Sequence, residues 1–99
     1  MFGLRDNDIE KLQSVFIRFP EVEKVVLYGS RAKGNYHDRS DIDLTMRGSR
    51  LDGTVSAEIA QALDDLLLPY MIDLSVYDRL SNPDLIEHIN RAGKLFYKK

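Results

Sequence analysis

The stretch LYGSRAKGNYHDRSDIDL, residues 27–44, contains the residues that decide the fold. A short apolar segment ends at the pair Gly29 and Ser30. After ten further residues, the aspartates Asp41 and Asp43 follow with a single residue between them. Glycine allows a tight backbone turn and the close approach of a ligand, whereas aspartate is disfavoured within strands. The stretch therefore predicts a strand, a tight turn and a second strand. The two aspartates are unfavourable in that second strand, so we expect them to have a functional role.

The carboxylates are candidate metal ligands. Asp41 and Asp43 share one face of the predicted strand 41–47, because side chains two residues apart on a strand lie about 6.5–7 Å apart on the same side. Asp73 lies in the predicted strand 70–77 and joins that face if the two strands pair. Three converging carboxylates raise each other's pKa, and their hard oxygens suit two Mg²⁺ or Mn²⁺ ions that clamp a phosphoryl displacement. The simpler alternative is that they are solvated aspartates on a polar sheet face.

The turn and its basic neighbours are candidate phosphate ligands. Ser30 offers a hydroxyl beside backbone N–H groups, and Arg31, Lys33 and Arg39 can bind phosphate oxygens. Taken alone, the Gly29-Ser30 pair favours an ordinary strand-to-helix turn with solvated basic residues. Taken with the carboxylates, it predicts a site for a metal-bound nucleoside triphosphate.

Hydrophobic periodicity and turn signals predict an α-β-α-β-α-β-α-β order in a single domain, residues 1–99. Asn7 and Glu10 predict a capping box for the first helix; Asn82 caps the last helix and Gly93 stops it. The expected fold class is α/β, with a mixed sheet and helices packed on one face. The other predicted elements lie at 8–19, 24–28, 30–33, 41–47, 55–68, 70–77 and, as an edge strand, 94–97.

Composition narrows the class of protein. The chain has 99 residues, 43% of them hydrophobic, and a net charge of −2, which disfavours a duplex-binding domain. It has no cysteine, which excludes disulfides and thiolate metal sites. With no signal-like start and no long apolar run, we expect a cytoplasmic protein without membrane contact. His37 is expected to be a solvated loop residue, and His88 is expected at the surface of the last helix.

The combined motif resembles that of the nucleotidyltransferases of the DNA polymerase beta superfamily, and in particular its minimal branch. By this resemblance, Gly29 and Ser30 hold the triphosphate and Asp41 and Asp43 ligate two Mg²⁺ ions. Asp73 ligates the catalytic metal and helps to activate the attacking hydroxyl. The implied reaction transfers AMP from ATP to an acceptor and releases pyrophosphate.

The resemblance also implies a partner. Larger members of the superfamily carry an added helical domain that binds the acceptor, and a 99-residue chain has no room for it. We therefore expect a separate helical protein of HEPN type, as in toxin–antitoxin systems whose transferase adenylylates a tyrosine of a toxic ribonuclease. The alternative is a non-catalytic nucleotide-binding antitoxin that neutralises its partner by contact. Direct nucleic-acid binding is not expected.

Overall fold

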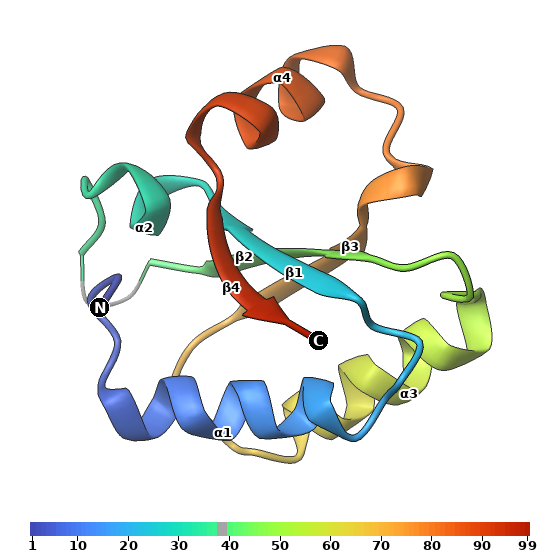
Figure 1. Cartoon of the computed structure of the whole chain (residues 1–99). Coiled ribbons are helices and arrows are strands. Elements are labelled where there is room, and N and C mark those ends of the chain that lie inside the picture. Colours follow the sequence, from blue (N-terminus) through green and yellow to red (C-terminus); the bar gives the residue numbers. More distant parts are fainter. Residues whose placement is uncertain (38–39) are drawn as a thin grey trace.

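The computed structural model describes residues 1–37 and 40–99, and its elements follow the predicted order of helices and strands (Figure 1). The elements are α1 (Asp6–Ile17), β1 (Lys24–Tyr28), α2 (Ser30–Lys33), β2 (Ile42–Arg47), α3 (Gly53–Asp64), β3 (Ile72–Val76), the 3-10 turn η1 (Tyr77–Arg79), α4 (Pro83–Ala92) and β4 (Lys94–Lys98).

The strands form one mixed sheet in the order β3-β2-β1-β4. β1 pairs antiparallel with both β2 and β4, whereas β2 pairs parallel with β3. A parallel pair needs a long crossover connection, and α3 provides it. The predicted mixed sheet, with the last strand at an edge, is confirmed.

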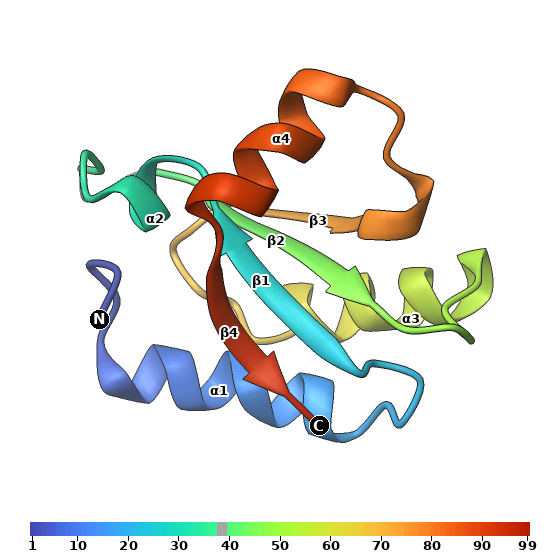
Figure 2. The same ribbon diagram turned by 45° about the horizontal axis from the view of Figure 1, so that its top comes forward.

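One face of the sheet carries the hydrophobic core, and α1 and α3 both lie against it (Figures 1 and 2). Side chains that alternate along the central strands point toward these helices, and burying each large aliphatic side chain contributes on the order of 1.5–3 kcal/mol. The fully buried residues of this layer include Leu12, Phe16, Val25, Leu27, Ile42, Leu44, Met46 and Ile59. The period of two along each strand leaves the other face of the sheet to the alternate, more polar side chains.

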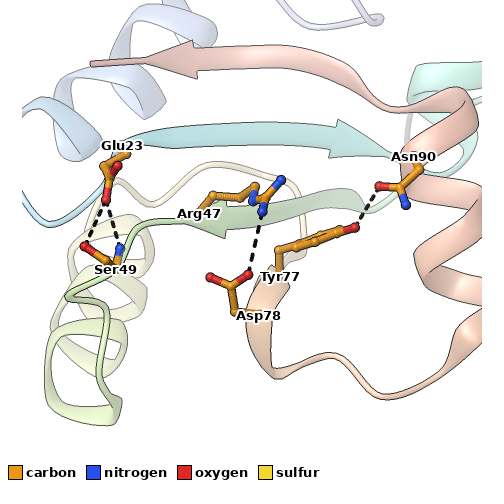
Figure 3. A network of polar contacts seen from close by, with 6 residues as sticks. All are labelled: Glu23, Arg47, Ser49, Tyr77, Asp78 and Asn90. Carbon is orange, nitrogen blue, oxygen red and sulfur yellow. Dashed lines mark hydrogen bonds and ion pairs between the residues drawn. The ribbon is translucent and has the colours of Figure 1, made fainter.

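The last helix, α4, lies over that second face, at the end of β1 (Figure 2). Its Ile89 is buried, and Tyr77 of η1 donates a hydrogen bond from its hydroxyl to Asn90 Oδ1 at 2.8 Å (Figure 3). Gly93, directly after the helix, lies so close to β1 that a Cβ at this position would collide with the side chain of Val26. The α/β class and the mixed sheet are confirmed; packing on one face describes α1 and α3, and α4 adds a helix to the other.

Helix boundaries differ from the predicted ones where local signals compete. The capping box of Asn7 and Glu10 is wrong, because α1 begins at Asp6 and no side chain caps it. α3 begins early, at Gly53, because the Asp52 carboxylate accepts a hydrogen bond from the Val55 amide at 2.8 Å.

The second half of the chain has one further boundary that differs from the prediction and one that agrees with it. α3 also ends early, at Asp64, and the residues that follow include Leu67 with φ 55°, which is not helical. The cap at Asn82 is confirmed. Among the described residues, no helix combines the length and the apolar character needed to cross a membrane.

Candidate active site

A row of three side chains crosses the sheet on the face beneath α4. In the strand register, Tyr28 of β1 pairs with Asp43 of β2, and Asp43 pairs with Asp73 of β3. Directly paired residues project from the same face of a sheet, so the two carboxylates stand side by side, as strand pairing predicted. Asp41 is exposed and lies just before the first residue of β2.

Gly29 is the residue against which Asp43 packs. It has φ 78° and ψ −155°, a backbone conformation that is essentially restricted to glycine. A Cβ at this position would collide with Asp43 Oδ2. Glycine is therefore required both for the turn that starts α2 and for the space that the carboxylate occupies.

Negative charge accumulates in this row. Partial burial raises the pKa of Asp43 above its usual value, and the charges of Asp73 and then Asp41 raise it further, while His88 opposes the shift. Burial likewise raises the pKa of Tyr28; a hydrogen bond with Ser75 opposes this, and the two neighbouring carboxylates add to it. A bound cation would relieve this repulsion.

The donor set suits a hard divalent cation, since it consists of carboxylate oxygens. Across residues 1–37 and 40–99, however, no three carboxylate or imidazole side chains are grouped closely enough to hold a metal ion. The structure thus brings Asp43 and Asp73 together. It does not group Asp41, Asp43 and Asp73 closely enough to hold one metal ion, although the sequence predicted such a group.

His88 of α4 completes the turn and was not predicted there. Its Nε2 accepts a hydrogen bond from the Gly29 amide at 3.0 Å, and its ring meets that of Tyr28 edge to face, with centroids 6.2 Å apart. His88 was expected at the surface of the last helix; it is partly buried there and is hydrogen-bonded to the turn. The two hydrogen-bonded residues are 59 positions apart in the sequence. The sequence signal that could have found this contact is that His88 directly precedes Ile89, which is buried.

Arg31 does not lie where a phosphate ligand would. It is only 2% exposed, and its Nε and Nη2 donate hydrogen bonds to the carbonyl of Ser40 at 3.1 and 2.9 Å. Its Nη1 donates to the carbonyl of Phe2 at 2.9 Å, and the guanidinium stacks on the rings of Tyr36 and Tyr70. The sequence predicted that this side chain binds phosphate. In the structure its guanidinium instead connects the N-terminal segment to the loop before β2.

The remaining predicted phosphate ligands have simpler surroundings. Ser30 is the first residue of α2 and is partly exposed, and Lys33 is exposed at the end of this helix. Arg39 lies outside the described residues.

A separate cleft of about 690 Å³ lies at the opposite end of the sheet, and no described residue of the predicted site lines it. Here Glu23 accepts hydrogen bonds from Ser49, and Arg47 lies 3.8 Å from Asp78 (Figure 3). These side chains are largely occupied with one another. Chemistry that involves Asp43 and Asp73 therefore belongs to the α2 end of the sheet.

A mixed sheet with two carboxylates in one row, beside a glycine turn, is the arrangement expected of a nucleotidyltransferase domain. The family model for polymerase beta nucleotidyltransferases matches residues 10–99. Because this match spans most of the chain, the protein belongs to that family. A comparison with curated protein sequences gives no match.

Solved structures of the same fold include chains from toxin–antitoxin complexes. A chain of a toxin–antitoxin complex with AMP-PNP is 29% identical, with a TM-score of 0.72 over 97% of this chain and 75% of the other. A chain of a mutant MntA toxin–antitoxin complex is also 29% identical, with a TM-score of 0.70 over 97% and 74%.

A third structure shows the fold alone. It is a tri-AMPylated Shewanella oneidensis HEPN toxin in complex with an MNT antitoxin, and the matching chain is 21% identical. Its TM-score is 0.70, over 97% of this chain and 74% of the other.

Replacing Gly29 by Ala should destabilise the protein by about 1–3 kcal/mol, because alanine avoids this conformation and its Cβ displaces Asp43. Urea unfolding followed by far-UV circular dichroism measures the change, since the chain has no tryptophan. The matched control is Gly34→Ala, at φ 84° with open space around the Cβ. Equal losses in the two variants would contradict the role of the Asp43 contact.

Replacing Arg31 by Lys should lower the free energy of unfolding by about 2 kcal/mol. A lysine cannot reproduce a fork that reaches two carbonyls, and hydrogen bonds from a charged donor are worth about 1.5–3 kcal/mol. The exposed neighbour serves as the control, and Lys33→Ala should change stability by less than about 0.5 kcal/mol. An unchanged unfolding midpoint for Arg31→Lys would show that this connection between the N-terminal segment and the loop is dispensable.

Replacing Asp43 by Asn should stabilise the metal-free protein near pH 7. The folded-state pKa of Asp43 is raised, so wild type has the full stability only below the unfolded-state pKa and loses it as the pH rises through the folded-state value. The gain from Asn should therefore shrink toward about pH 4. Denaturant unfolding at several pH values, with the exposed Glu58→Gln as control, measures it, and a gain that does not depend on pH would argue against charge repulsion.

Proposed function

We propose that this protein is a metal-dependent adenylyltransferase that moves AMP from ATP onto a tyrosine of a HEPN-type partner protein, and so acts as an antitoxin. The observation that carries the proposal is the pairing of Asp43 with Asp73 beside the Gly29 turn. Membership of the nucleotidyltransferase family supports the reaction type. The similar chains from toxin–antitoxin complexes, one of them with AMP-PNP, support the nucleotide and a toxin as the partner.

Each part of the site has an assigned role. Gly29 and Ser30 hold the triphosphate, and Lys33 supplies positive charge near it; Arg39, which lies outside the described residues, stays a predicted ligand. The carboxylates of Asp41, Asp43 and Asp73 would hold two Mg²⁺ ions, or Mn²⁺ in their place. When bound, these ions neutralise the charge that develops on the attacking and leaving oxygens.

The transfer needs a positioned acceptor and a place for one proton. The tyrosine oxygen forms a bond to the α-phosphorus of ATP while the bond from that phosphorus to pyrophosphate breaks. A tyrosine hydroxyl has an ordinary pKa of about 10, so the proton must be removed, and the Asp73 carboxylate accepts it. Orientation of the two substrates supplies most of the remaining acceleration.

A second candidate function is neutralisation by contact, without catalysis. The observation that favours it is the open carboxylate group, which holds no three-ligand arrangement among the described residues. In that case the nucleotide would strengthen the complex, or play no part in it, and no covalent change would occur.

The experiment that tests the proposal combines labelled ATP, Mg²⁺ and a purified HEPN-type partner. We expect the label to appear on a partner tyrosine, and Asp43→Asn or Asp73→Asn to reduce transfer at least about a hundredfold. The control is Glu58→Gln, which removes an exposed carboxylate from α3 and should transfer normally.

Two results would overturn the proposal. The first is transfer that persists in Asp43→Asn, which would show that the Asp43 carboxylate is not part of the catalytic site. The second is a partner that Asp43→Asn silences as well as wild type does, in the absence of ATP, which would establish neutralisation by contact.

A further inference from the structure

His88 is the link between α4 and the turn that carries the candidate site. Its Nε2 receives the Gly29 amide hydrogen, which requires an imidazole with no proton on that nitrogen. Its ring also packs on Tyr28, whose partner in the strand register is Asp43. One side chain thus contacts the last residue of β1 and the first residue of the turn.

The hydrogen bond acts on the dihedral that matters most at this turn. The Gly29 amide belongs to the peptide plane that sets φ of Gly29, and at its φ of 78° the position where a Cβ would stand is occupied by the Asp43 carboxylate. Rotation of this plane would move the Ser30 backbone and open the space beside Asp43. An acceptor at a fixed position therefore holds the turn and the carboxylate in one geometry.

The acceptor is itself well anchored, because the residues of α4 that follow His88 are fixed. Tyr77 donates to Asn90 at 2.8 Å, two residues further along the helix (Figure 3). Ile89 is buried against the sheet, and Gly93 allows the end of the helix to approach Val26 closely. The position of Nε2 is thus set by the packing of the C-terminal part of the helix.

We propose that His88 is a positioning residue for nucleotide transfer: through its bond to the Gly29 amide it holds the turn in the conformation that receives the triphosphate beside Asp43. This inference rests on the proposed function. It makes α4 part of the nucleotide site, although the sequence places His88 far from the Gly-Ser pair.

Two substitutions separate the hydrogen bond from the packing of the ring. His88→Leu keeps an apolar side chain against Tyr28 and removes the acceptor. His88→Gln loses the ring and offers a carbonyl oxygen at a reach similar to that of Nε2. The neighbouring Glu87→Gln changes an exposed side chain of the same helix and is the control.

The measurements are steady-state AMP transfer to the HEPN-type partner, equilibrium binding of Mg²⁺-ATP, and the amide proton shift of Gly29 by NMR. For His88→Leu we expect the KM for ATP to rise and kcat to fall by about threefold to tenfold in total, the range that the loss of one hydrogen bond produces. The KM for the partner should stay unchanged, and the Gly29 amide proton should move upfield. His88→Gln should restore transfer to within about twofold of wild type.

The outcomes distinguish this inference from the proposed function. If wild type transfers AMP and His88→Leu matches it in both constants, the positioning role is overturned and the function stands. If His88→Leu and His88→Gln are equally impaired, packing of the ring explains the loss and the hydrogen-bond role is overturned. If wild type neither binds Mg²⁺-ATP nor transfers AMP, both proposals fall.

Discussion

The parallel pairing of β2 with β3 is the constraint on which the rest of the site depends. The same register that places Leu44 beside Leu74 on the core face places Asp43 beside Asp73 on the other. A slip by one residue would move the apolar set into solvent and the carboxylates into the core. The hydrophobic layer under α1 and α3 therefore holds two like charges next to each other, although their repulsion opposes this arrangement.

The turn after β1 depends on that arrangement in a second way. Gly29 adopts a conformation that other residues avoid, and the missing side chain provides the space for the Asp43 carboxylate. Three elements thus define one small volume: β1 ends there, β2 supplies the carboxylate, and α4 supplies the hydrogen-bond acceptor. The packing of these elements explains how the chain maintains this arrangement.

Much of this arrangement could be predicted from the sequence, because it rests on short-range patterns. Alternation along 41–47 and 70–77 gave the two faces, and β-branched residues bounded by Gly29 gave β1 with its observed limits. The order of elements and the cap at Asn82 followed from local signals as well.

What could not be predicted depends on distant contacts. Arg31 is a residue type that often binds phosphate, yet its guanidinium donates hydrogen bonds to the carbonyls of Phe2 and Ser40. His88 contacts Gly29 only because α4 packs back over the sheet. No residue pattern in the sequence predicts that contact. The capping box of α1 had the correct residue types and failed because the helix begins one residue before Asn7.

The place of β3 at the end of the sheet order has a consequence for the dynamics of the site. An end strand is held by backbone hydrogen bonds on one side only, and such elements open locally at a lower free energy than central strands do. Asp73 lies on this strand, whereas Asp43 lies on its inner neighbour. A ligand that joins the two carboxylates would hold the end strand to its inner neighbour, and part of its binding energy would be spent on suppressing the local opening of that strand.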